Sequence, residues 1–428
     1  MDLLEYKKAV LLHALLLAYI GVRPIMKYYE TINLLPRINF TLVMIIGLGG
    51  YVLFAIRYIK QSRIFIKPIR QLSSCLLIYI VLIQIIYLPS ILMYGISLVN
   101  YIHITSETII ASMIMWLIGS KINILESLLN NHKIKNITFG LFMLFIVTIF
   151  IGVTLRYVYN YGSGFYIYLN GAQNYLMIAD SFAVFSLLII NYTKKKKNKF
   201  ILFFISAVCL YSTLSRTSLY AFLLVSIISY SIKSFNYGRR YKIKHSKILI
   251  QLTFFIVLII LIITIYDDIR IRENFDFVND NRMFRIIFNR DSDISATSRD
   301  TILDKGIEDI KNNIFFGNFM VEIKRNGSSG GYIHNYLSYW QQYGIIVFIV
   351  LNFIILYIIF RNFVIFRKYK NNKTIQFIFE LSLFVIISIV FSRAYVYPYI
   401  WLIVSMSTIY NLGETINEKN KCINASFQ

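Results

Sequence analysis

The chain has 428 residues, of which 57% are hydrophobic and 15% charged, and its mean hydropathy is +0.62. Soluble domains carry about 25% charged residues, and disordered chains are poor in apolar residues. The composition therefore excludes both classes and indicates a protein with many membrane-spanning helices.

Apolar runs that are long enough to cross a bilayer recur along the chain. A spanning helix needs roughly 20 mostly apolar residues. The first run resembles a signal peptide, but no small-residue cleavage site follows it, so we expect a retained helix. The twelve predicted spans are residues 8–27, 38–56, 72–94, 104–120, 137–155, 172–192, 200–214, 217–232, 248–266, 344–360, 375–392 and 398–411.

Positive charge is concentrated in short segments between these runs. The net charge is +23, and four segments without any acidic residue hold nearly half of the 44 basic residues: 57–70, 194–199, 233–247 and 361–373. Basic short loops are typical of the cytoplasmic side of a membrane protein. With twelve spans, all four segments and both termini are then cytoplasmic. The segments lie outside any folded basic domain, so we expect no nucleic-acid partner.

We therefore predict an all-α polytopic membrane protein with one long extracytoplasmic loop. Residues 1–266 form spans 1–9, residues 267–343 form the catalytic loop, and residues 344–428 form spans 10–12 and a cytoplasmic tail. Within residues 267–331 lie 12 of the 21 acidic residues, together with 10 basic ones. Long polar loops are uncommon and are usually functional.

An amphipathic helix is predicted inside this loop, over residues 300–313. Its apolar residues recur at helical spacing, which favours a helix lying over the membrane face. Residues 297–300 offer an N-cap for it. The apolar positions are Ile302, Leu303, Gly306, Ile307 and Ile310.

Three residues are candidates for chemistry at the outer face. Arg216 lies among hydroxyl residues in the turn between the seventh and eighth spans, where its planar fork can bind a phosphate. Arg299 precedes the amphipathic helix, and His334 follows a glycine-rich stretch and suits general-base work. The alternatives are a snorkelling arginine for Arg216, a solvated loop charge for Arg299 and an interfacial hydrogen bond for His334.

Two further ionisable residues, Asp180 and Glu380, lie within predicted spans, where they pair with cations or line a cavity. Asp291 and Asp293 have a spacing seen in metal-bound nucleotide-sugar sites, but two carboxylates in an acidic loop are a weak signal. We therefore expect neither a metal nor a cofactor. The sequence lacks a Walker loop, so ATP-driven transport has no support.

Three segments, in this order, resemble motifs of the bacterial O-antigen polymerase and O-antigen ligase superfamily. The likeness covers roughly residues 200–360. The segments are the hydroxyl-arginine turn of residues 210–218, Arg299 with its helix and the turn ending at Gly317, and the His334-Asn335-Tyr336 segment followed by Gly344.

The resemblance implies an inverting, metal-independent glycosyl transfer at the outer face of the bacterial cytoplasmic (inner) membrane. The donor is a glycan on undecaprenyl pyrophosphate. Arg216 and Arg299 would bind and stabilise the pyrophosphate, His334 would act as base, and Asn335 and Tyr336 would contact substrate. The implied partners are the lipid-linked glycans, the lipid bilayer and a chain-length regulator protein.

Three functions remain open on the sequence. A polymerase passes the glycan to another lipid-linked repeat unit, whereas a ligase passes it to a lipid A core sugar. We favour the polymerase because the chain is rich in Ile, Lys, Asn and Tyr, as products of AT-rich polysaccharide clusters often are. A lipid-linked sugar transporter would instead place its charged site near the bilayer midplane, around Asp180 and Glu380.

Overall fold

The computed structural model describes residues 3–36, 45, 49, 68–93, 98–122, 128–159, 165–169, 175–235, 294–326, 331–369 and 371–409, and the regular elements within these ranges are helices. They are α1 (Leu3–Leu17), the π-helix η1 (Ala18–Val22), α2 (Arg23–Thr31), α4 (Pro68–Met93), α5 (Leu98–Thr105), the π-helix η2 (Ser106–Ile110), α6 (Ala111–Gly119), α8 (His132–Val158), α9 (Tyr175–Tyr192), α10 (Lys196–Ser212), α11 (Arg216–Phe235), α15 (Ile294–Asn312), α16 (Val321–Asn326), α17 (Leu337–Lys368), α18 (Lys373–Phe391) and α19 (Tyr399–Ile409).

Helices occupy ten of the twelve predicted spans, and the spans at 38–56 and 248–266 lie outside the described residues except for positions 45 and 49. Six helices in the described part are long and apolar enough to cross a membrane, and two shorter apolar helices accompany them. The protein is therefore a multi-pass membrane protein of helical fold. The count of twelve spans and the placement of both termini stay predictions. The six are Ala9–Thr31, Gln71–Pro89, His132–Val158, Tyr175–Tyr192, Leu337–Lys368 and Lys373–Phe391.

The outer surface of α17 shows why this bundle needs a lipid environment. Large apolar side chains repeat every three or four residues along one face of the helix and remain exposed, whereas the opposite face is buried against α18 and other helices. A continuous exposed apolar stripe is unstable in water and is satisfied by lipid tails. The exposed residues are Ile346, Ile349, Phe353, Leu356 and Phe360.

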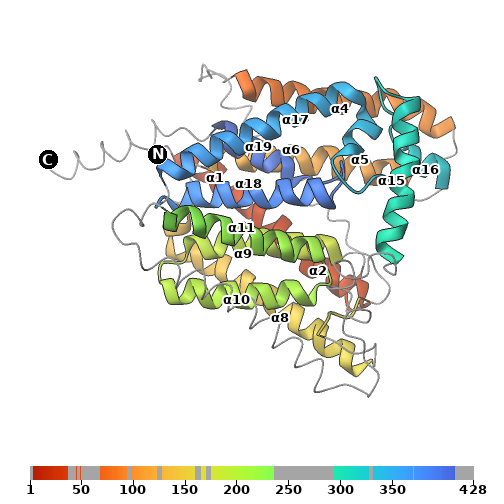
Figure 1. The fold of residues 1–428 in the computed structure, drawn as a ribbon. Helices are drawn as coiled ribbons and strands as arrows, with labels where there is room; N and C mark the ends of the chain where they lie inside the picture. Colours follow the sequence, from red (N-terminus) through yellow and green to blue (C-terminus); the bar gives the residue numbers. More distant parts are fainter. Residues whose placement is uncertain are drawn as a thin grey trace.

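Helix α9 forms the centre of one half of the bundle. Its residues 178–189 are buried on every side, and it packs against α10, α11 and α18. A helix that is apolar all round belongs in a protein interior. Figure 1 shows α9, α10, α11, α17 and α18 running side by side along a common direction. The polar residues of α9 therefore have to find partners inside the protein.

The described residues of three predicted basic segments, 194–199, 233–235 and 361–373, lie near one end of this bundle. The Tyr192 hydroxyl is 2.9 Å from the Thr374 hydroxyl, which joins the end of α9 to the start of α18. Lys199 Nζ donates to the Asn191 carbonyl, and Lys233 donates to Gln376. Because α10 and α18 both start here, the turn after α10 and the turn after α18 lie at the other end.

Helix α15 crosses that other end, roughly perpendicular to the long helices (Figure 1). It begins at Ile294, so the N-cap predicted at residues 297–300 is wrong, and Arg299 lies inside the helix rather than before it. Thr301 Oγ1 donates to the Thr297 carbonyl, which is a bond within a helix. Threonine and serine hydroxyls inside a helix can donate to the carbonyl four residues earlier instead of capping the helix start. The Thr-Ser-Arg-Asp pattern of residues 297–300 therefore does not identify the first turn of α15.

Two glycines bring the turn after α15 directly onto α17. Gly317 and Gly344 have φ of +66° and +83°, and Gly344 kinks α17 where the tenth span was predicted to begin. A Cβ on Gly344 would lie 2.0 Å from the Phe315 carbonyl oxygen. Ile345 N donates to the Ile314 carbonyl at 3.0 Å, and Asn318 N donates to the Gln341 carbonyl at 2.8 Å. Only glycine permits this backbone contact.

Candidate functional site

The turn that carries Arg216 is tight and strained. Helix α10 ends at Ser212, α11 begins at Arg216, and between them Leu214 takes a φ of 64°. Thr213 Oγ1 donates to the Leu210 carbonyl at 2.7 Å, which satisfies an open carbonyl at the end of α10. A left-handed leucine costs of order 1 kcal/mol or more, and such strain gathers at functional sites. Arg216 thereby occupies the first position of α11, and the residue is buried, with 9% of its surface exposed.

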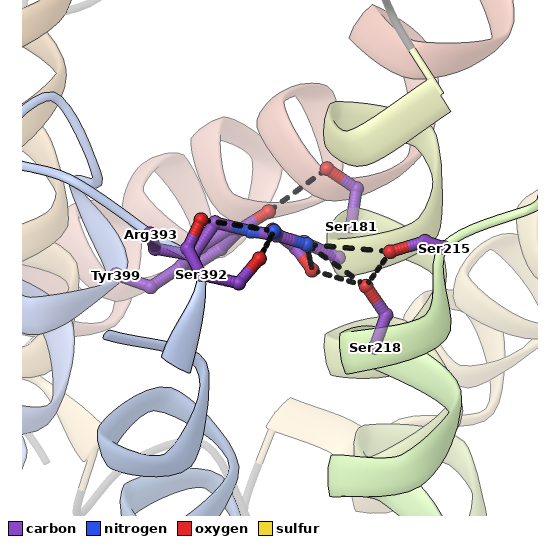
Figure 2. A network of polar contacts seen from close by, with 7 residues as sticks. Ser181, Ser215, Ser218, Ser392, Arg393 and Tyr399 are labelled. Carbon is purple, nitrogen blue, oxygen red and sulfur yellow. Dashed lines mark hydrogen bonds and ion pairs between the residues drawn. The ribbon is translucent and has the colours of Figure 1, made fainter. Parts of the chain in front are cut away.

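A buried ion pair anchors this turn to two other parts of the bundle. Arg393, in the turn after α18, binds both carboxylate oxygens of Asp180 from α9, with Nη2 at 2.7 Å from Oδ1. The same nitrogen donates to Ser218 Oγ at 3.0 Å and contacts Ser215 Oγ at 3.4 Å. Figure 2 shows Arg393 reaching across to Ser215 and Ser218, which flank Arg216 on its turn.

The serines complete a directed hydrogen-bond network. Ser218 Oγ donates to Asp180 Oδ1 at 2.6 Å, so the 2.6 Å contact between the two serines must be a donation from Ser215 to Ser218. Ser181 is hydrogen-bonded at 2.9 Å to the Tyr399 hydroxyl at the start of α19 (Figure 2). Consecutive residues of α9 therefore hold both sides of the turn between α18 and α19.

The segment that carries His334 packs between α15 and α17. Ile333 N donates to Gln341 Oε1, and the Ile333 side chain lies so close to Gly306 of α15 that a Cβ there would be 2.2 Å away. Asn335 Oδ1 accepts from Leu337 N at 2.9 Å, which fixes the start of α17. The Tyr336 ring stacks on Phe348 with centroids 5.5 Å apart. Asn335 and Tyr336 thus have local structural roles, and substrate contact by them stays a prediction.

Aromatic rings connect His334 to the turn after α18. The His334 ring lies 5.2 Å from the Tyr332 ring, which in turn meets the Tyr395 ring edge-on at 5.3 Å. Tyr395 follows Arg393 by two residues, and its backbone N–H donates to Ser338 Oγ at 2.9 Å. The Arg393–Tyr395 turn therefore contacts both the Arg216 turn and the His334 segment.

A fully buried carboxylate, that of Glu322, contacts one of these aromatic residues. Glu322 of α16 accepts from Gln342 Nε2 at 3.0 Å and from the Tyr395 hydroxyl at 3.2 Å. Burial raises the pKa of Glu322, although both hydrogen bonds oppose the shift. Burial also raises the pKa of Tyr332 to about 12, the Glu322 carboxylate adds to the shift, and the Arg393 guanidinium opposes it. Tyr332 is therefore a neutral phenol well above pH 7.

Arg299 lies on the helix that covers this end of the bundle. It precedes Gly306 by seven residues, about two helical turns, so both residues are on the same face of α15. That face contacts the bundle, because Gly306 adjoins Ile333 and Ile310 is 8% exposed. Asp309 on α15 accepts from Gln341 Nε2 at 2.8 Å and pairs with Arg325. Arg299 therefore lies on the same side of α15 as Gly306 and is half-buried, and its function stays a prediction.

The structure brings the Arg216 turn and the His334 segment to one end of the bundle, and it assigns partners to the carboxylates within the spans. Asp180 pairs with Arg393, whereas Glu380 accepts from Asn191 at 2.6 Å and from Ser229 and Gln376. The two carboxylates belong to separate hydrogen-bond networks, and each accepts hydrogen bonds from its own set of donors. The position of Asp291 and Asp293 lies outside the described residues.

Sequence reasoning missed Arg393, Glu322 and Gln342. Arg393 stands as one cation between two apolar runs, and its partner is 213 residues away. The only sequence signal was a pair of unmatched ionisable groups, Asp180 in one span and Arg393 beside another. Gln341 and Gln342 carried a weaker signal as consecutive amides that open an otherwise apolar helix.

Residues 201–352 match the family model of the O-antigen ligase. The matched region includes the Arg216 turn, α15 with Arg299, and the His334 segment through the kink at Gly344. No curated protein matches the chain. Members of the matched family are glycosyltransferase-like enzymes of O-antigen and glycan assembly. This part of the chain is therefore similar to the O-antigen ligase and polymerase superfamily.

Proposed function

We propose that this protein polymerises undecaprenyl-pyrophosphate-linked oligosaccharide repeat units into a surface polysaccharide at the outer face of the bacterial cytoplasmic membrane. The observation that carries the proposal is the joining of the Arg216 turn and the His334 segment through Arg393 and Tyr395. An arginine on a serine-anchored turn and an imidazole are thereby held at one end of a membrane-spanning bundle. These are the groups that transfer from a pyrophosphate donor requires.

The reaction needs charge stabilisation on one side and proton removal on the other. The acceptor hydroxyl oxygen forms a bond to the anomeric carbon of the donor glycan while the bond from that carbon to the phosphate oxygen breaks. The electron pair leaves with undecaprenyl pyrophosphate, and His334 takes the hydroxyl proton. Attack from the face opposite the leaving group inverts the anomeric centre.

Arg216 stabilises the negative charge that develops on the leaving pyrophosphate, and Arg299 contributes from α15. Cations that are fixed before the reaction stabilise such charge without reorganisation, which is why a rigid turn is suited to the task. The strained Leu214 and the serine network hold the Arg216 backbone in one position. The pyrophosphate bond is already activated, so the reaction needs no nucleotide.

The experiment supplies purified protein with its lipid-linked repeat unit, without added metal, and separates the products by size. Wild type should give a ladder of longer lipid-linked glycans, and His334→Ala should give none. A ladder from both would keep the polymerase and remove His334 from the role of base. No ladder from wild type, followed by transfer to a lipid A core acceptor, would instead make the protein a ligase.

A further inference from the structure

The donors of Arg393 are all engaged, although the residue lies beside the proposed site. Nε and Nη2 bind the two oxygens of Asp180, Nη2 also reaches Ser218, and Nη1 donates to the hydroxyl and carbonyl of Ser392. Its side chain is 6% exposed. A guanidinium has five N–H donors, and here none is left to bind a phosphate. The adjacent Asp180 also cancels its charge.

The partners of Arg393 belong to elements that are distant in sequence but adjacent in the fold. Asp180 comes from α9, Ser215 and Ser218 come from the Arg216 turn and the start of α11, and Ser392 follows α18. Two residues after Arg393, Tyr395 contacts Tyr332, Glu322 and Ser338 around the His334 segment. The turn after α18 is thus bound on one side to Arg216's turn and on the other to His334's segment.

We infer that Asp180 and Arg393 are positioning residues, which set the distance and orientation between Arg216 and His334 without touching the substrate. This inference rests on the proposed function. A planar guanidinium that binds a carboxylate through two bonds fixes direction as well as distance, which a point charge does not. Reaction rates depend steeply on such placement, since a displacement of about 1 Å can cost roughly 100-fold.

The decisive variant removes both charges together, as Asp180→Asn with Arg393→Gln. Breaking only one side leaves a buried charge without its partner, whereas neutralising both sides often leaves a protein that folds. The folded double variant should lose kcat by about 100-fold, with a donor KM within a few-fold of wild type, because misplacement weakens contacts made in the transition state. A folded double variant with wild-type kcat would show that the pair only supports the fold.

Two single variants keep the inference testable if the double variant does not fold. Arg393→Lys retains the charge but cannot bind Asp180 and the serines at once, so it should fall between wild type and the double variant. Full activity of this lysine variant would overturn the geometric role. Glu380→Gln is the matched control, because this buried carboxylate lies about 16 Å before the end of α18 and belongs to the other network. It should keep the wild-type kcat per folded molecule.

A distance measurement separates this inference from the proposed function. Spin labels are placed through Tyr220→Cys on α11 and Phe316→Cys on the turn after α15, since both side chains are exposed. Cys75 and Cys422 are first replaced by serine, and Cys209 is buried. The distance distribution should be narrow with the pair intact and should shift or broaden in the double variant, whether or not wild type makes polymer. An unchanged distribution, alongside a normal wild-type ladder, would refute the positioning role alone.

Discussion

Replacement of Gly344 by alanine tests the contact that holds the end of α15 on α17. The backbone there has φ 83° and ψ 178°, a region that only glycine adopts readily, and an L residue pays about 1–3 kcal/mol to enter it. The added Cβ would also lie 2.0 Å from the Phe315 carbonyl oxygen and 2.5 Å from its carbon. The backbone segments around Phe315 and Gly344 must therefore move apart.

Separation loses the backbone bonds from Ile345 to Ile314 and from Asn318 to Gln341, each with a net value of about 1 kcal/mol. Together with the strain, Gly344→Ala should lower the free energy of unfolding by about 4 kcal/mol. It should also reduce polymer formation, because α15 and the His334 segment lose their common support.

The assay is a reversible denaturant titration of the purified protein in detergent micelles, with Gly140→Ala as the control. Gly140 lies inside α8 and has no atom within 4 Å of an added Cβ, so its replacement should stabilise by at most about 1 kcal/mol. Equal stability of Gly344→Ala and wild type would refute the close backbone packing described here.

Three other predictions follow from the site. Burial raises the pKa of Glu322 above its ordinary value of 4.5, so the folded state holds more protons than the unfolded state. The stability that this group contributes is therefore lost as the pH rises through the folded pKa, and the melting temperature should fall with it. Glu322→Gln should remove this fall in melting temperature, and an unchanged dependence of melting temperature on pH in the variant would contradict the assignment. Arg216→Lys should recover only part of the activity lost in Arg216→Ala, because an ammonium lacks the planar fork, and a fully active lysine variant in the ladder assay would argue against bidentate binding. Chain extension should persist in a chelator, whereas loss that magnesium restores would move attention to Asp291 and Asp293.

Much of the architecture follows from hydropathy, because a spanning helix must be apolar along its length. The same rule could not find the pairs that close the site. Asp180 and Arg393 are 213 residues apart, and no local pattern says which of 44 basic residues meets a given carboxylate. Their pairing depends on how α9, α11 and α18 pack, which is a property of the whole bundle.

For the predicted site residues too, neighbours in the sequence indicate the local turn or helix, whereas contacts with distant residues appear only in the folded structure. Arg216 was recognised because hydroxyl residues surround it within one turn, and the structure shows that turn tied to α9 and α18. Residues 297–300 resemble a cap in the sequence and so predict Arg299 before its helix, although the helix begins at Ile294. Gly344 stood out as a glycine in a motif, but only the packed backbone of residues 314–317 explains why no other residue fits.

The central claim is that Arg216 and His334 act on the same bond in one site, and a double-mutant cycle tests it most directly. Initial rates of chain extension from the lipid-linked repeat unit are measured for wild type, Arg216→Lys, His334→Gln and the combined variant. Residues that act as a unit give losses that do not multiply, so the combined variant should be little slower than the slower single variant. Losses that multiply would show that the two residues act independently and would contradict a common site.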